Sequence, residues 1–282
     1  MTIITISRGS YSRGKEVAEV VAERLGYECV ARDVLLEAME QFHIPEIKLI
    51  RAIHDAPSIL ERFGHTKEKY VACIQEAFLK RVKHDNVVYH GLAGHFFLRG
   101  ISHVLKVRII ADMEDRIRLE MERENITEDE AKQTLRDDDN ERRKWSQYLY
   151  GIDTSDVSLY DLTVHIRKLT SDSAAEIICD TVREEQFQAT PESMRSMNDL
   201  LLSAEIKVSL MHHSHNAEVS AQDGAVTVKV RGHYLQRTRL NREITGIVET
   251  FTDVKGVHVE TYPLRLPHFN SNRLYHETGS QL

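Results

Sequence analysis

The residues most able to carry chemistry lie near the start of the chain, in the run GSYSRGKE from Gly9 to Glu16. Two glycines with four residues between them, followed at once by a lysine, are typical of a loop that holds phosphate groups. The glycines let the backbone approach a phosphate closely, while backbone N–H groups and the lysine neutralise its charge. The residues expected to bind a nucleotide are Gly9, Ser10, Ser12, Arg13, Gly14, Lys15 and Glu16.

One position departs from the usual motif, because Glu16 stands where a Ser or Thr hydroxyl would bind Mg²⁺. A carboxylate repels phosphate unless a cation lies between them, although an acid in the first turn of a helix is favoured by the helix dipole. A bland alternative is a glycine-rich turn that only caps a helix. The pattern favours a bound phosphate, and Glu16 departs from the chemistry that usually binds a Mg²⁺ cofactor at such a loop.

The flanking residues predict the strand and the helix that such a loop must join. Thr2 to Ile6 is a short β-branched run, typical of a buried strand. After the loop, apolar residues recur on one helical face as far as Leu25, and Gly26 follows as a stop signal. Strands alternating with helices predict an α/β fold, a parallel sheet of the P-loop type with helices on both faces. Further strands are predicted at 27–31, 86–89, 103–111 and 162–166, and helical regions at 32–41, 44–84, 112–149 and 171–185.

A second, smaller unit is predicted after a polar stretch that carries Pro191. Asp223 and Gly224 lie between two alternating runs, which is a strong hairpin signal. The pattern predicts an α+β domain of the order αββαβ, with a helix at 198–211, strands at 217–222 and 225–231, a helix at 236–251 and a strand at 257–262. The predicted domains are 1–185 and 198–262, with a linker at 186–197 and a tail at 263–282.

Length and charge limit the class of protein. The 282 residues are enough for two cores, and 41% hydrophobic with 29% charged residues is ordinary for a globular protein. The net charge of −7 argues against a nucleic-acid partner. No apolar run approaches the roughly 18 residues that span a membrane, and the start lacks the pattern of a secretion signal. A cytoplasmic location is therefore expected.

The cysteines and a histidine cluster offer no clear metal site. Cys29, Cys73 and Cys179 are odd in number and widely spaced among apolar neighbours, which predicts buried free thiols. The cluster HHSH at 212–215 has no nearby Cys or carboxylate ligand, so a polar helix end is the favoured interpretation. No metal site is expected from these residues.

The opening segment ITISRGSYSRGKEVAEVVAERLGY resembles the start of the cytidylate kinase-like P-loop proteins, which often have a basic residue and Glu at the positions of Lys15 and Glu16. Further segments resemble this family in order, so the likeness covers about residues 1–183. They are ARDVLLEAM with Arg32 and Asp33, KVRIIADMEDRI with Arg116, the lid-like ITEDEAKQTLRDDDNERRKWSQYLYG with Asp139 and Arg142, and SLYDLTVHI with Asp161.

This resemblance implies phosphoryl transfer from ATP to a nucleoside monophosphate. Lys15 and the loop amides would hold one side of the transferred group, and arginines from the lid would close over it. The implied catalytic residues are Lys15, Arg116, Arg136 and Arg142, and the implied substrate-binding residues are Arg32, Asp33 and Asp161. The alternative for the arginines is a solvated helix face with partners such as Glu120 and Glu141.

One departure from the family weakens the implied acceptor site. Such kinases commonly have Gly-Arg after the third strand, whereas this chain has Gly91-Leu92, and leucine cannot bind phosphate. Either His90, His95 or Arg99 compensates, or the monophosphate pocket is altered. Two functions stay open: a nucleoside monophosphate kinase-like transferase, and a catalytically weak nucleotide-binding regulator.

The C-terminal segments NDLLLSAEIKVSLMHH and AEVSAQDGAVTVKVRGHY resemble a BON domain over about residues 198–262. Gly224, Gly232 and Gly256 stand where that family places turn glycines. The resemblance implies that this unit binds a protein or phospholipid partner and performs no catalysis. A regulatory or assembly role beside a nucleotide-binding domain is the expectation.

Overall fold

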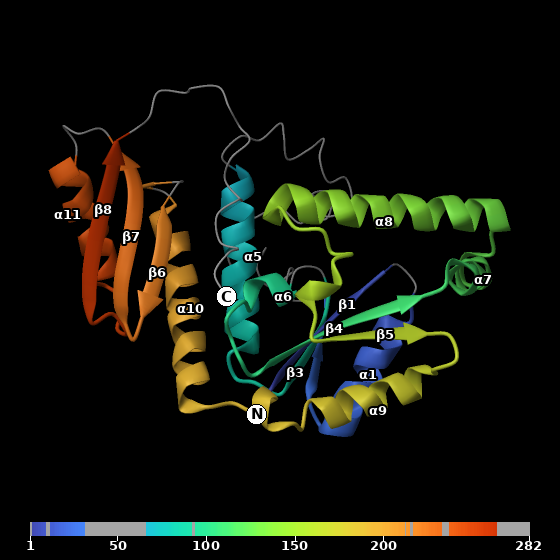
Figure 1. Ribbon diagram of the computed structural model, residues 1–282. Helices are drawn as coiled ribbons and strands as arrows, with labels where there is room; N and C mark the ends of the chain where they lie inside the picture. The colour runs from blue at the N-terminus through green and yellow to red at the C-terminus, as the bar shows by residue number, and fades with distance from the viewer. Residues whose placement is uncertain are drawn as a thin grey trace, which may run out of the picture.

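The computed structural model shows two units that meet along helix α10, Pro191–Leu210 (Figure 1). The predicted helix at 32–41, the first part of the helical region at 44–84 and nearly all of the tail lie outside the described residues. Those described are 2–9, 12–31, 66–91, 94–211, 213–214, 217–232 and 237–263.

The first unit is built on a five-stranded sheet of order β2-β3-β1-β4-β5, in which every pair of neighbours is parallel. The strand that leads into the glycine-rich loop is central, as a buried β-branched run predicts. The predicted parallel α/β fold is therefore confirmed. The strands are β1 (Ile3–Arg8), β2 (Glu28–Val30), β3 (Val87–His90), β4 (Val104–Ala111) and β5 (Leu162–Ile166).

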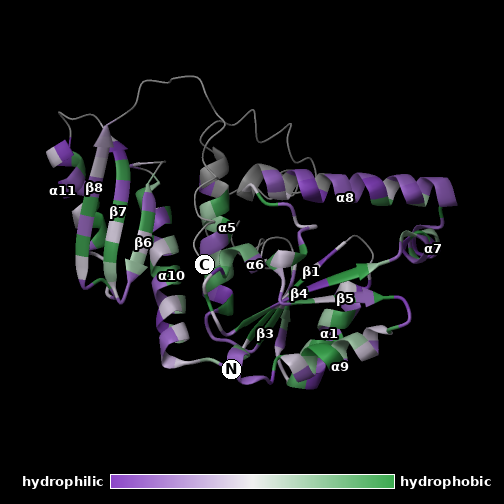
Figure 2. Ribbon diagram, viewed as in Figure 1, coloured by the Kyte–Doolittle hydropathy of each residue, from purple (hydrophilic) through white to green (hydrophobic). Residues whose placement is uncertain are grey.

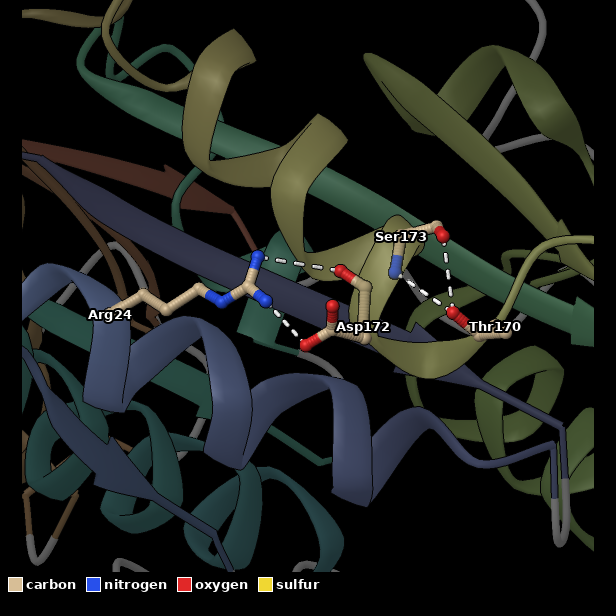
Figure 3. Close-up of polar contacts among 4 residues, drawn as sticks. All are labelled: Arg24, Thr170, Asp172 and Ser173. Atoms are coloured by element: carbon tan, nitrogen blue, oxygen red, sulfur yellow. Dashed lines mark hydrogen bonds and ion pairs between the residues drawn. The ribbon is translucent and has the colours of Figure 1, made fainter.

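Helices pack on both faces of this sheet. Helices α1 (Gly14–Leu25) and α9 (Ser171–Thr181) share one core with β1, while α5 (Thr66–Val82), α6 (Gly94–Phe97) and α10 share the other. Figure 2 shows the hydrophobic strands between these helices. Arg24 of α1 binds the carboxylate and the carbonyl of Asp172 at the start of α9, where Thr170 accepts a hydrogen bond from the backbone of Ser173 (Figure 3).

The charged region predicted as helical over 112–149 forms two helices, α7 (Met113–Glu124) and α8 (Glu128–Tyr150). Asn125 ends α7 in a left-handed conformation with φ 54°. Thr127 and Glu130 then form a capping box that starts α8. The sequence carries this start signal as Thr-x-x-Glu, and it was overlooked.

The second unit is a three-stranded sheet of order β6-β7-β8 with helices packed on it. Strands β6 and β7 form the predicted hairpin, with Asp223 and Gly224 at positive φ of 50° and 80° in the turn, while β8 runs parallel to β7. The predicted αββαβ order is confirmed. After α10 the elements are β6 (Glu218–Gln222), β7 (Ala225–Gly232), α11 (Arg237–Val248) and β8 (Gly256–Pro263).

Helix α10 begins well before residue 198, so it includes most of the stretch predicted as a linker. Thr190 caps the helix by accepting a hydrogen bond from the backbone of Ser193 (3.1 Å), and Pro191 takes the first position, where its missing N–H costs nothing. One face of α10 enters the core of the first unit and another the core of the second. The division into domains at 186–197 stays a prediction.

The exposure of the cysteines and the search for a membrane-spanning helix test two further expectations. Cys73 and Cys179 are buried free thiols as predicted, but the prediction for Cys29 was wrong. Cys29 is exposed on β2, which is the edge strand of the sheet. Within the described part of the chain, no helix is both long enough and apolar enough to cross a membrane.

The double burial of α10 predicts a stability effect of a residue outside the predicted first domain. Met197 has 0% exposed surface and packs in the core of the first unit. Met197→Ala should lower the free energy of unfolding by about 2–5 kcal/mol, because it leaves a cavity in that core. Urea unfolding followed by circular dichroism measures this. The matched control is the exposed neighbour in Asn198→Ala, and equal effects of the two variants would contradict the packing.

Candidate functional site

The glycine-rich loop connects the end of the central strand β1 to the start of α1. Ser12 is fully buried, and its Oγ lies within hydrogen-bonding distance of the carbonyls of Gly9 (3.1 Å) and Ile109 (3.3 Å). This hydroxyl can donate its one proton to either carbonyl, so it either closes the loop through Gly9 or ties it to β4 through Ile109. Ser10, also predicted to bind nucleotide, lies outside the described residues.

The N-terminus of α1 gives the loop a positive pole. Arg13 precedes the helix in a left-handed conformation with φ 59°, and its carbonyl accepts the N–H of Val17 (3.0 Å). The N–H groups of the first helical turn have no acceptor within the helix, and the positive end of the dipole lies there. An anion at this point gains both hydrogen bonds and a favourable field.

Gly14 is required by its contact with Arg8 at the end of β1. A Cβ atom on Gly14 would lie 2.7 Å from Cβ and 2.8 Å from Cδ of Arg8. A separation this short requires the strand end or the helix start to move. The glycine therefore sets how closely α1 approaches the strand.

Lys15 and Glu16 are exposed at the mouth of the loop. Lys15 Nζ lies 3.6 Å from a carboxylate oxygen of Glu19, and Glu16 lies 3.9 Å from the guanidinium of Arg13. Exposed pairs of this kind contribute little, so Lys15 can exchange Glu19 for a phosphate at low cost. Arg13 is also the cation that lies beside Glu16, which limits repulsion between this carboxylate and a bound anion.

Two cavities adjoin the loop and share Arg8 and Arg142 in their walls. The larger, of about 790 Å³, lies between α1, α7 and α8 and is lined also by Arg13, Lys15, Glu16, Glu19, Leu119, Glu122, Arg123 and Asp138. The smaller, of about 250 Å³, lies between the loop, the end of β4, α8 and residues 153–155. Its remaining lining residues are Gly9, Ser12, Arg108, Ile110, Ala111, Arg116, Asp139, Asn140, Arg143, Asp153, Thr154 and Ser155.

The smaller cavity is rich in arginine, with two carboxylates against five guanidinium groups. Arg116 is buried, donates to Asp139 (2.8 Å), and its guanidinium carbon lies 3.7 Å from the position a Cβ of Gly9 would take. Arg142 reaches from α8 to the carbonyl of Arg8 (3.5 Å). Guanidinium groups held around one space are suited to bind phosphate oxygens.

The structure brings most of the described candidate residues together, but not Arg136 and Asp161. Arg136 is exposed on α8 and lines neither cavity. Asp161 precedes β5 and accepts the backbone N–H of Lys106 (2.8 Å), so it pins two strands away from the loop. Arg32, Asp33 and Leu92 lie outside the described residues. The site roles given to all these residues stay predictions.

Three arginines of the smaller cavity were missed from the sequence: Arg8, Arg108 and Arg143. Arg8 and Arg108 lie in strands of the parallel sheet, one at the end of β1 and one within β4. An arginine inside an apolar strand is unusual, because a charge is rarely buried without a partner. That signal could have identified Arg108 in the run KVRIIA.

His95 cannot supply the positive charge that Leu92 lacks. Its ring is buried, with centroid distances of 3.9 Å to Phe96 and 4.9 Å to Tyr160. Burial, together with the nearby charges of Arg108, Lys106 and Arg99, lowers the pKa of His95 to about 3. The imidazole is therefore neutral at neutral pH.

The acidic groups of the smaller cavity are few and engaged. Hydrogen bonds from the backbone and hydroxyl of Ser155 (2.9 and 2.8 Å) lower the pKa of Asp153, so this carboxylate stays charged. Asp139 binds Arg116. Within the described ranges, no group of three or more His, Cys, Asp or Glu side chains could hold a metal ion by itself.

Known proteins resemble this chain over its first unit. Curated relatives include the cytidylate kinase of Archaeoglobus fulgidus, 27% identical over 188 residues, and that of Sulfolobus acidocaldarius, 24% identical over 188 residues; each match covers 66% of this chain and 97% of the relative.

Similar solved structures include an uncharacterized protein from Eubacterium ventriosum, with TM-score 0.49, 17% identity and coverage of 66% of this chain and 100% of the other. Shikimate kinase from Acinetobacter baumannii gives TM-score 0.40, 16% identity and coverage of 67% and 96%. Scores this low carry no argument, so the fold assignment depends on the strand order itself. The model of the cytidylate kinase-like family matches residues 3–168, which is more than half of the chain, and the chain therefore belongs to the cytidylate kinase-like family.

Proposed function

We propose that this protein transfers the terminal phosphoryl group of ATP to a nucleoside monophosphate. The observation that carries the proposal is the shared wall of the two cavities, formed by Arg8 and Arg142. Donor phosphates bound at Lys15 and the start of α1 would meet an acceptor phosphate in the arginine-lined cavity at this wall. Relatives named cytidylate kinase support a reaction of this class.

The proposed mechanism is electrostatic. In phosphoryl transfer, negative charge spreads over the oxygens of the transferred group, and catalysis depends on positioning and on neutralising that charge. Arg116 is held against Gly9 by Asp139, and Arg142 is held by the carbonyl of Arg8. Because the protein fixes these guanidinium groups before a ligand binds, little reorganisation is needed in the transition state. Arg136 takes part if α8 moves closer to the loop.

The residues present fit Mg²⁺ that is bound mainly by the nucleotide. Mg²⁺ usually takes one or two carboxylates together with substrate phosphates and water. Asp153 lines the smaller cavity and would be such a carboxylate, whereas Asp139 is taken up by Arg116. When bound, the ion neutralises phosphate oxygens. Glu16 lies beside Arg13 and is not needed as a ligand.

The second candidate function is a nucleotide-binding regulator with weak catalysis, which Glu16 at the usual hydroxyl position favours. We propose that the C-terminal unit is BON-like, supported by its αββαβ order and by Gly224 in the hairpin turn. The exposed side chains of β7 include Lys229 and Arg231, which would suit an acidic protein surface or a phospholipid head group. In this alternative, nucleotide binding controls that contact.

Formation of ADP distinguishes the two functions. The purified protein is incubated with ATP, Mg²⁺ and, in turn, CMP, UMP, AMP or GMP. The transferase should form ADP at a rate that depends on one or more of these acceptors. A protein that binds ATP but forms no ADP with any of them would be the regulator.

Loss of the lysine charge should weaken ATP binding. Lys15→Ala is expected to raise the dissociation constant for ATP about 10- to 150-fold, the range for a hydrogen bond to a charged group. Isothermal titration calorimetry measures this. Lys229→Ala, which removes an equal charge from an exposed position in the second unit, is the control and should leave ATP affinity unchanged. Equal affinity in wild type and Lys15→Ala would place ATP elsewhere.

The contact between Gly14 and Arg8 predicts a strong effect of one methyl group. Gly14→Ala should destabilise the protein by about 1–3 kcal/mol and weaken ATP binding, because the strand end or helix start must shift. Gly246→Ala is a matched control in the interior of α11, where a Cβ meets nothing within 4 Å. The control should be neutral or stabilise the protein by roughly 0.5–1 kcal/mol. Urea unfolding and calorimetry test both variants, and a well-tolerated Gly14→Ala would contradict the close approach.

A further inference from the structure

Arg108 is a half-buried guanidinium in the wall of the smaller cavity, at the carboxyl end of the sheet. It lies on β4 directly opposite Ser7 of β1 in the register of the strands. Its neighbours Val107 and Ile109 point into the core shared with α1, so alternation along the strand places Arg108 on the opposite face. The backbone of Arg108 is therefore fixed by the sheet, and its side chain lines the cavity.

One nitrogen of this guanidinium is fully used by the protein. Arg108 Nη1 donates to the carbonyl of Thr154 and to the hydroxyl of Tyr160 (3.2 Å), and the guanidinium carbon lies 5.4 Å from the centre of the Tyr160 ring. The Tyr160 hydroxyl lies 3.0 Å from both Ser7 Oγ and the Thr154 carbonyl. Tyr160 thus fixes one edge of Arg108. Among the described residues, Nε and Nη2 make no hydrogen bond.

Unlike Arg116 of the same cavity, Arg108 has no carboxylate partner in the described part of the chain. Arg116 binds Asp139, Arg123 binds Glu120 and Glu124, and Arg167 binds Asp112. Asp153 lines the same cavity but accepts its hydrogen bonds from the backbone and hydroxyl of Ser155. A half-buried charge without a counter-ion is costly, so an anionic ligand is the partner that this position suits.

The position of Arg108 in the smaller cavity indicates which substrate carries the anionic group that would bind it. Arg108 lines the smaller cavity and is absent from the wall of the larger one, where Lys15 lies. The neutral imidazole of His95 leaves Arg108 as a fixed cation on that part of the sheet. An anion bound by Nε and Nη2 would lie on the acceptor side of the shared arginine wall.

We propose that Arg108 binds the phosphate of the phosphoryl acceptor and replaces the arginine that position 92 lacks, with Tyr160 as the residue that positions it. The proposal rests on the proposed function and specifies its substrate class. The acceptor is a phosphate monoester, not a neutral alcohol. A planar guanidinium with two nitrogens left for a ligand matches two oxygens of such a group.

Binding of the acceptor in the absence of ATP tests this directly. Calorimetry with CMP, UMP, AMP and GMP, each beside its unphosphorylated nucleoside, identifies the monophosphate that the wild-type protein prefers. Arg108→Gln should weaken binding of that monophosphate about 10- to 150-fold and leave ATP affinity little changed. Arg108→Lys should have a smaller effect, because it keeps the charge but loses the bidentate geometry.

A matched control separates loss of this contact from loss of any arginine. Arg167→Gln removes an exposed arginine that binds Asp112 and lines neither cavity. This variant should bind the monophosphate as the wild type does. Circular dichroism melting curves on all variants show whether each is folded.

Tyr160→Phe tests the positioning role, because it keeps the ring but removes the hydroxyl that fixes Arg108. In steady-state assays this variant should raise the KM for the monophosphate more than it lowers kcat, with the KM for ATP unchanged. A hydroxyl needed only for folding would lower the melting temperature and leave the KM for the monophosphate unaltered. That result would overturn the role of Tyr160.

The outcomes also separate this inference from the proposed function. If the monophosphate binds through Arg108 but no ADP forms, the proposed function fails and Arg108 stands. If ADP forms while a folded Arg108→Gln variant keeps the wild-type affinity and KM for the monophosphate, the inference fails and the function stands. An equal loss of ATP and monophosphate affinity, or a folded wild-type protein that binds no monophosphate, also overturns the inference.

Discussion

The close packing of Gly14 against Arg8 is the constraint on which the site depends. It sets how near α1 comes to the end of β1, and so where the positive end of the helix lies. It also fixes the stem of Arg8, whose side chain separates the two cavities and whose carbonyl receives Arg142 from α8. The donor side, the acceptor side and the lid helix are therefore all placed relative to one strand–helix junction.

Around this junction, the partner of each arginine determines how much of its positive charge a ligand can use. Asp139 neutralises Arg116 and, because it comes from α8, ties that helix to the start of α7. Arg108 is instead held by neutral oxygen atoms of Tyr160 and Thr154, which orient the guanidinium without cancelling its charge. Neutral partners thus leave the charge of Arg108 available to a phosphate, whereas the carboxylate of Asp139 reduces the field that Arg116 offers.

The sequence predicted the parallel sheet, the strand–loop–helix context and the small αββαβ unit, because these depend on local periodicity and on turn residues. It could not show how α8 folds over the loop, since the pairing of Arg116 with Asp139 joins residues on different helices. Asp161 illustrates the same limit: its motif suggested substrate binding, while its hydrogen bond to Lys106 depends on strand register. The role of Arg108 could not be predicted, because it depends on residues that are near it in space but distant in the sequence.

Helix α10 joins the second unit to the first through their hydrophobic cores. Apolar side chains on two of its faces enter different cores, so neither core is complete without it. Lys80 of α5 forms ion pairs in this contact. Its Nζ lies 2.6 Å from the buried Glu76 and 3.4 Å from Glu205 of α10. Burial raises the pKa of Glu76, and the hydrogen bond and charge of Lys80 oppose that rise without cancelling it. Because α5 leads directly into β3, displacement of α10 would act on the sheet that carries the loop and Arg108.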